Sequence, residues 1–185
     1  MKRVIIVILC GFLTFSTTVA NNVKFMGISM EAPFSEFVSE LSNKCEIVGV
    51  NSSVAIFNGD FAGLKDCSIM VGTTDGLLIV MVVSQEYKSW QQLKSDYLAI
   101  TDAYEKKYGT PTQKELSFKG SYYDGDGYEM TAVKNDKCNY TMSYLIDETL
   151  LVTIFIGKDS TINFAYAIIK KEKEPTKIEV NTDDI

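Results

Sequence analysis

The chain has 185 residues, of which 46% are hydrophobic and 23% charged, values typical of a folded globular protein rather than a disordered one. It contains no histidine, and its single arginine is Arg3. The lack of histidine excludes Ser-His and Cys-His nucleophile pairs and histidine-liganded metals. Because Arg3 lies in a predicted signal segment, we expect the mature chain to have no arginine fork for phosphate or carboxylate. The net charge of −6 disfavours nucleic acid as a partner.

Residues 1–20 predict a secretory signal peptide. A basic Lys-Arg start precedes an apolar run from Val4 to Phe15, and Thr18 and Ala20 occupy the −3 and −1 positions of a cleavage site. The apolar run is too short to span a bilayer, so we expect an exported protein, periplasmic or extracellular, with no membrane span. Lipid attachment at Cys10 is disfavoured because Leu9 precedes it, where lipoprotein processing requires Gly, Ala or Ser.

The first part of the chain beyond the signal predicts one helix followed by strands. The helix covers Pro33–Asn43, where proline suits the first helical position and apolar residues recur every three or four positions. Apolar runs then predict strands at Cys45–Val50, Val54–Phe57, Asp66–Thr73 and Leu77–Ser84. Asn58-Gly59 and Asp75-Gly76 between them are typical hairpin turns. Leu77–Val83 is apolar on both faces, which predicts a central strand or one that faces the other half of the chain.

The second part repeats this plan with a longer helix. Ser89 and Gln92 form a capping-box pattern, an apolar stripe begins at Trp90, and Gly109 ends the helix. The strands predicted after it are Gln113–Phe118, Tyr128–Val133, Cys138–Ile146, Leu150–Ile156 and Ile162–Ile169. Several alternate strictly between apolar and polar residues, which is typical of antiparallel sheets with one buried face.

The sequence therefore predicts an α+β fold built as a tandem pair of helix-plus-antiparallel-meander units, with about four strands each. The first unit covers residues 21–86 and the second 87–170, and each helix packs on one face of its own sheet. Residues 66–83 and 137–156 echo each other, with Cys67 aligned to Cys138. Residues 171–185 predict a charged, flexible tail.

One loop carries the candidate binding residues, which are Tyr122, Tyr123, Asp124, Asp126 and Tyr128. Its Asp-Gly-Asp-Gly core resembles the start of a calcium loop, but the twelfth position from Asp124 is an asparagine where such loops require glutamate. A turn between strands is therefore the favoured interpretation, without a metal. The neighbouring tyrosines predict a contact patch, because interfaces are enriched in tyrosine.

Three cysteines remain beyond the signal: Cys45, Cys67 and Cys138. They are possible disulfide participants, and an odd number allows at most one internal disulfide with one thiol left over. No Cys-x-x-Cys pair is present, so redox and zinc chemistry have little support. We expect no cofactor.

Several short motifs, in this order along the chain, resemble a family of small secreted proteins of gut Bacteroidales. They are KFMGISMEAPFSEFVSEL, FNGDFAGLKDCSIMV, W-x-x-L-x-x-x-Y and KKYGTP. The resemblance implies a fold and an extracytoplasmic compartment, and it assigns no activity. The tandem plan is also similar in topology to β-lactamase-inhibitor proteins and to small outer-membrane-assembly lipoproteins, and topology does not transfer function.

We therefore predict a non-enzymatic binding or accessory module whose partner is another extracytoplasmic protein, bound through exposed strand edges and tyrosine-rich loops. The alternative is a hydrolase that uses two carboxylates, since such catalysis needs no histidine. That alternative requires two carboxyl groups about 5–10 Å apart in a cleft, and we expect no such pocket.

Overall fold

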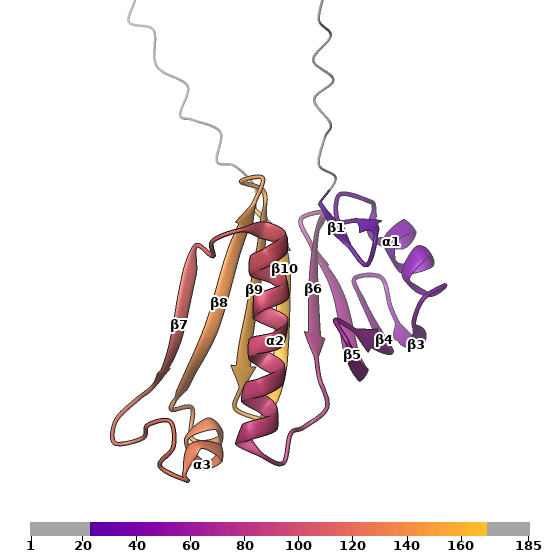
Figure 1. Cartoon of the computed structure of the whole chain (residues 1–185). Coiled ribbons are helices and arrows are strands. Elements are labelled where there is room, and N and C mark those ends of the chain that lie inside the picture. The colour runs from indigo at the N-terminus through magenta and orange to yellow at the C-terminus, as the bar shows by residue number, and fades with distance from the viewer. Residues whose placement is uncertain (1–22, 170–185) are drawn as a thin grey trace, which may run out of the picture.

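The computed structural model describes residues 23–169, so the predicted signal peptide and tail lie outside the described residues. The chain forms an eight-stranded sheet, a two-stranded sheet and three helices (Figure 1). The elements are β1 (Lys24–Phe25), β2 (Ile28–Ser29), α1 (Phe34–Leu41), β3 (Glu46–Val50), β4 (Val54–Phe61), β5 (Leu64–Thr74), β6 (Leu77–Val83), α2 (Trp90–Tyr108), β7 (Gln113–Phe118), α3 (Glu129–Lys134), β8 (Cys138–Ile146), β9 (Leu150–Gly157) and β10 (Thr161–Ile168). The predicted α+β class with antiparallel strands is confirmed.

All eight long strands belong to one sheet, in the order β3-β4-β5-β6-β10-β9-β8-β7. Two meanders, β3 to β6 and β7 to β10, meet where β6 pairs with β10, with Val83 opposite Asn163. The two sheets expected from the sequence are therefore joined edge to edge. This junction makes β6 a central strand, as the two-faced apolarity of Leu77–Val83 predicted.

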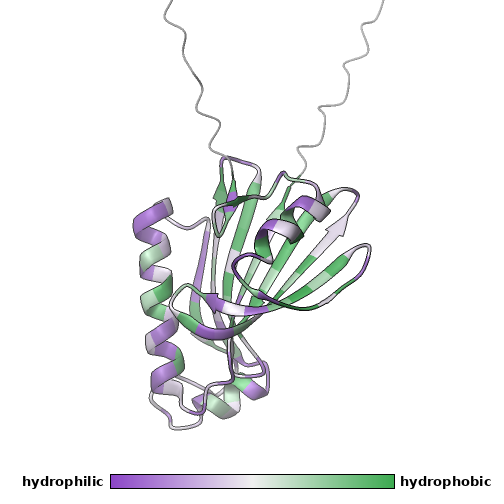
Figure 2. Cartoon of the chain, turned by 90° about the vertical axis from the view of Figure 1, so that its right-hand side faces the viewer, coloured by the Kyte–Doolittle hydropathy of each residue, from purple (hydrophilic) through white to green (hydrophobic). Residues whose placement is uncertain are grey.

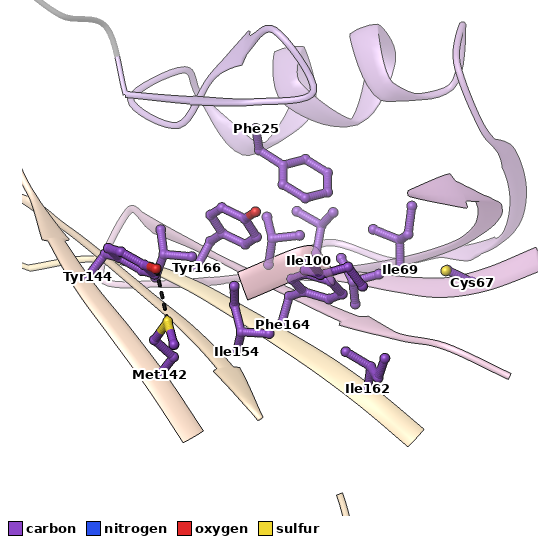
Figure 3. Packing of buried hydrophobic residues seen from close by; sticks show 14 of the residues in the cluster. Phe25, Cys67, Ile69, Ile100, Met142, Tyr144, Ile154, Ile162, Phe164 and Tyr166 are labelled. Atoms are coloured by element: carbon purple, nitrogen blue, oxygen red, sulfur yellow. Dashed lines mark hydrogen bonds between the residues drawn. The ribbon is translucent and has the colours of Figure 1, made fainter. Parts of the chain in front are cut away.

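The helices and the small β1-β2 sheet cover the same face of the large sheet. Phe37 of α1 and Tyr97 of α2 belong to a single buried cluster with the inward residues of the strands. Phe25 of β1 points toward Tyr166 of β10, with ring centroids 5.1 Å apart in a T-shaped arrangement (Figure 3). One core therefore lies between the sheet and everything packed on this covered face.

The helix α2 begins and ends as predicted. The Ser89 hydroxyl accepts a hydrogen bond from the Gln92 backbone N–H at 3.2 Å, and Gly109 ends the helix at a positive φ of 80°. The Gln92 side chain donates to Asp96 instead of returning to Ser89, so only half of the capping box forms. Among residues 23–169, no helix combines the length and hydrophobicity needed to cross a bilayer.

The strand predicted at Tyr128–Val133 is wrong, because this segment forms the short helix α3. Glu129, Ala132 and Val133 are its buried residues, at helical spacings of three and four. The alternation that suggested a strand covers six residues, which is too short a window to separate the two periodicities.

The turn predicted at Asn58-Gly59 is also wrong. Both residues lie inside β4, and the chain reverses four residues later at Ala62 and Gly63, which have φ values of 51° and 87°. Gly59 serves another purpose: a Cβ atom there would lie 2.6 Å from the Cys45 sulfur. The other predicted turn, at residues 75–76 between β5 and β6, is confirmed, with positive φ at both positions.

Candidate functional site: the open face of the sheet

The face of the large sheet opposite the helices, here called the open face, is not covered by any helix among residues 23–169. Four of its large apolar side chains are well exposed: Ile56 (39%), Met70 (45%), Ile79 (39%) and Leu145 (44%). Figure 2 shows hydrophobic residues spread along the strands, whereas α2 alternates between hydrophobic and hydrophilic positions. A solvated antiparallel face is ordinarily polar, so these exposures are unexpected for a face that only contacts water.

Strand register places these side chains next to one another. Ile56 of β4 is paired with Met70 of β5, and Met70 is paired with Met81 of β6, which faces Ala165 of β10. Side chains of directly paired residues lie about 5 Å apart on one face of a sheet. Together Ile56, Met70, Met81 and Ala165 therefore form a continuous apolar row across four strands.

A second row runs beside the first. Ile79 of β6 pairs with Ala167 of β10, Ala167 with Leu151 of β9, and Leu151 with Leu145 of β8. We call the two rows together the apolar band. The band is well exposed at the four positions named above and half-buried at the positions that connect them. Contiguous apolar surface marks interaction sites, and methionine adapts to irregular partners.

Polar residues border the apolar band. The next row of paired positions includes the exposed Asn58 and Ser68, the half-buried Thr141 and the buried Asn163, interrupted by Val83 and Phe155. At the far end of the first row, the hydroxyls of Ser143 and Thr153 form a hydrogen bond of 3.0 Å. An apolar centre with a polar rim is the usual composition of a protein–protein interface.

The predicted tyrosine loop lies elsewhere, against the N-terminal end of α2. Asp124 accepts a hydrogen bond from the Trp90 indole N–H at 2.8 Å and pairs with the Lys94 ammonium group. The Lys94 ammonium, with a smaller contribution from Trp90, holds the pKa of Asp124 below its usual value. The carboxylate therefore anchors the loop to α2.

The other acidic groups of the loop also make internal contacts. Asp126 accepts from the backbone N–H groups of Tyr123 (3.1 Å) and Tyr128 (2.7 Å). Glu129, 6% exposed, accepts from the Gly125 N–H at 2.7 Å. The loop is thus fixed, and it exposes Tyr123 (63%) and Tyr128 (64%) to solvent.

Tyr122 contributes less to this surface. It is half-buried, and its hydroxyl accepts a hydrogen bond from the Asn135 side chain at 3.4 Å. The structure therefore brings together the five loop residues predicted from sequence and adds two that sequence reasoning did not assign to the site, Trp90 and Lys94. Nothing in the local sequence shows these contacts, since they join positions 30 and 34 residues apart.

The edges of the large sheet differ from each other. Every residue of β3 is exposed, including Ile47, Val48 and Val50, although a bulge between Ile47 and Gly49 interrupts its register. The opposite edge, β7, carries Lys114, which forms an ion pair of 3.2 Å with Glu105 of α2. Charges protect an edge from pairing with other chains, so β3 is the more accessible edge.

Cys45, Cys67 and Cys138 are free thiols and all are buried. Burial raises the pKa of each, and it raises that of Cys138 to about 12. Thiols of this kind are poor nucleophiles at neutral pH.

One hollow does gather carboxylates. It has a volume of about 280 Å³, and Asp66, Glu86 and Asp96 are among its lining residues. Lys88 lowers the pKa of Glu86, whereas a general acid needs a raised value. Asp96 accepts hydrogen bonds from the Tyr87 hydroxyl and the Gln92 amide, each at 2.8 Å. Within residues 23–169, no group of three or more Cys, Asp or Glu side chains is arranged to hold a metal ion.

Comparison of the chain with protein-family models, with curated proteins and with solved structures finds no match.

Proposed function

We propose that this protein is an exported, non-enzymatic binding module that docks another extracytoplasmic protein on the apolar band. The observation that carries the proposal is the exposure of Ile56, Met70, Ile79 and Leu145 on an uncovered face of a rigid sheet. Removing these side chains from water is favourable in proportion to the apolar area covered. A partner with a complementary apolar surface would supply that cover.

The rigidity of the open face favours recognition. Each strand of the apolar band is hydrogen-bonded within the sheet, and the covered face beneath it carries one continuous buried cluster. A surface that needs no ordering on binding loses little conformational entropy when the complex forms. Tyr123 and Tyr128 would provide a second contact for a large partner, because their loop is held by Asp124 and Asp126.

The alternative function is a carboxylate-dependent hydrolase, and the hollow lined by Asp66, Glu86 and Asp96 is the observation in its favour. Carboxylate catalysis requires one acid that is protonated near neutral pH, held there by burial. Glu86 pairs with Lys88, which favours its charged form. This pairing makes the binding module the better-supported function.

We also propose that the two halves of the chain are structural repeats, each a helix followed by a four-stranded meander. The element order supports this, with α3 as an insertion after β7. A two-fold relation within the sheet would match β4 with β8 and β5 with β9. The sequence echo instead aligns Cys67 of β5 with Cys138 of β8, so the echo and the strand order give different equivalences.

Site-specific photo-crosslinking in the producing cell tests the binding function. A photoreactive residue in place of Met70 should give a covalent adduct with one other protein, whereas the same residue in place of Gln91, exposed on α2, should give none. Adding Ile79→Glu to the variant with the photoreactive residue at position 70 should abolish the adduct. The new carboxylate in the apolar band would be buried without a partner when the complex forms.

Asn58→Glu is the matched control, since it adds the same charge on the open face outside the apolar band. It should leave the adduct intact. Equal crosslinking from Met70 and Gln91, or equal loss with both glutamate variants, would refute docking on the apolar band. Turnover of a substrate that is lost on Asp96→Asn would support the hydrolase instead.

A further inference from the structure

A hollow of about 390 Å³ lies at the C-terminal end of α2, on the covered side of the sheet and away from the apolar band. We call it the tyrosine hollow, and its walls include Lys24, Phe25, Phe61, Tyr104, Lys107 and Tyr166. Four elements contribute to it: β1, the end of β4, α2 and β10. Its volume falls in the range of about 300–1,000 Å³ that is typical of small-molecule sites.

The floor of the tyrosine hollow is aromatic and buried. Phe25 stacks on Phe61 with ring centroids 5.0 Å apart and meets the edge of Tyr166 at 5.1 Å. Phe25 and Tyr166 are 1% and 4% exposed, and Figure 3 shows both rings from β1 and β10 turned toward each other. Such walls favour a flat, apolar ligand body through offset-stacked and edge-to-face contacts.

Two tyrosine hydroxyls meet in this hollow, because Tyr104 and Tyr166 are hydrogen-bonded to each other. Their mutual bond uses one of the two O–H protons, and the other proton remains free to bond a ligand oxygen. The hollow therefore offers a fixed hydrogen-bond donor among its apolar walls.

The charge of the tyrosine hollow is positive. Lys24 and Lys107 line it and are both exposed, which places them at its rim, and its lining contains no aspartate or glutamate. Neither lysine forms an ion pair with any residue between 23 and 169. The Lys107 ammonium lies 4.7 Å from the centroid of the Tyr108 ring. In a chain whose acidic residues outnumber its basic ones by 24 to 18, two lysines at one rim that form no ion pair within residues 23–169 are a local cationic site.

These observations together specify one chemical class. We propose that the tyrosine hollow binds a small aromatic carboxylate, with its ring packed against the lining formed by Phe61 and Tyr104 and its carboxylate at Lys24 and Lys107. A cation of comparable shape would meet two like charges, and a neutral compound would leave both ammonium groups unpaired. A second hollow of about 540 Å³ shares both lysines, but Asp147 lines it, so it suits an anion less well.

Calorimetric titration of the purified protein with 2-naphthoate and with 2-naphthamide tests this assignment. The two probes share a ring system and differ in charge. Naphthoate should bind about tenfold more tightly than naphthamide, because hydrogen bonds to charged groups are stronger than neutral ones and the carboxylate would meet two lysines. Replacing both lysines in a K24Q/K107Q variant should remove that preference and leave naphthamide affinity unchanged.

Ala103→Trp should abolish binding of both probes, because Ala103 lines the tyrosine hollow from an exposed position of α2. Ala99→Trp is the matched control: it lies one turn earlier, is also exposed, and is not among the lining residues. Unchanged melting temperatures show that both variants fold. Absence of naphthoate binding, equal affinity for the two probes, or equal loss with the two tryptophan variants would overturn the assignment.

Discussion

Replacing Tyr97 with alanine tests which face of α2 packs on the sheet. Tyr97 is fully buried, and its ring meets that of Tyr140 with centroids 5.7 Å apart. A buried aromatic side chain covers about 150–250 Å², which at about 25 cal/mol per Å² is about 4–6 kcal/mol. Measured losses for large-to-alanine changes are about 3–5 kcal/mol, because the cavity relaxes in part. We therefore expect Tyr97→Ala to lower the free energy of unfolding by about 4 kcal/mol.

Tyr97→Phe separates the contribution of the ring to the free energy of unfolding from that of the hydroxyl. The Tyr97 oxygen lies 3.5 Å from the Ile154 carbonyl oxygen, at the limit of a hydrogen bond, so this change should cost under about 1 kcal/mol. The outward control is Gln91→Ala, which should change stability by no more than about 0.5 kcal/mol. Lys94 is unsuitable as that control, because it pairs with Asp124.

Urea unfolding followed by circular dichroism gives the three free energies, and a thermal scan should show a decrease in melting temperature of about 8–16 °C for Tyr97→Ala. Equal shifts for Tyr97→Ala and Gln91→Ala would refute the packing of α2 described above. A loss of several kcal/mol for Tyr97→Phe would instead show that the hydroxyl, and not the ring, carries the stability.

Three further predictions concern other parts of the chain. The pKa of Asp124 is lower in the folded state than the unfolded value of 3.8, so its contribution to the free energy of unfolding is present above pH 3.8 and is lost as pH falls through the folded pKa. For this half-exposed pair the loss should be under about 1 kcal/mol. Asp124→Asn should remove that acid-dependent loss in urea titrations at pH 2–7. Gly59→Ala should destabilise the fold by about 1–3 kcal/mol through its clash with the Cys45 sulfur, and adding Cys45→Ala should recover much of that loss. N-terminal sequencing of the secreted protein should begin at Asn21, and a lipid-bearing Cys10 as first residue would contradict it.

The elements that depend on contacts between residues close in sequence were predictable from the sequence. The helix α2 was predictable from the Ser89 cap, its apolar stripe and Gly109, because capping and periodicity lie within one segment. The hairpin at Asp75 was predictable for the same reason, since positive φ selects Asp-Gly pairs. Where two local patterns competed, as in α3, the sequence favoured the wrong one: Glu129 is buried by its bond to Gly125, a contact that periodicity does not encode.

The binding surface was only partly predictable. The apolarity of both faces of Leu77–Val83 predicts a central strand, but not the exposure of Ile79, which follows from the packing of the helices of residues 23–169 on one face. Asn58-Gly59 has the sequence of a hairpin turn, whereas the close approach of Gly59 to Cys45 arises from the β3-β4 pairing, which the local sequence does not show. The tyrosine hollow was not predictable from local patterns, because Lys24 and Lys107 are 83 positions apart in the chain.

The position of β10 has a consequence for how the protein is made. Val83 and Asn163 are neighbours in the sheet although 80 residues separate them in the chain. Until β10 emerges during synthesis or export, β6 and β9 both present unpaired backbone edges, and β6 is itself the apolar segment Leu77–Val83. Pairings of such long sequence separation form late, and exposed edges of this kind promote aggregation. Nascent chains that stop short of Thr161 should therefore depend on chaperones, and maturation should be limited by the arrival of this last strand.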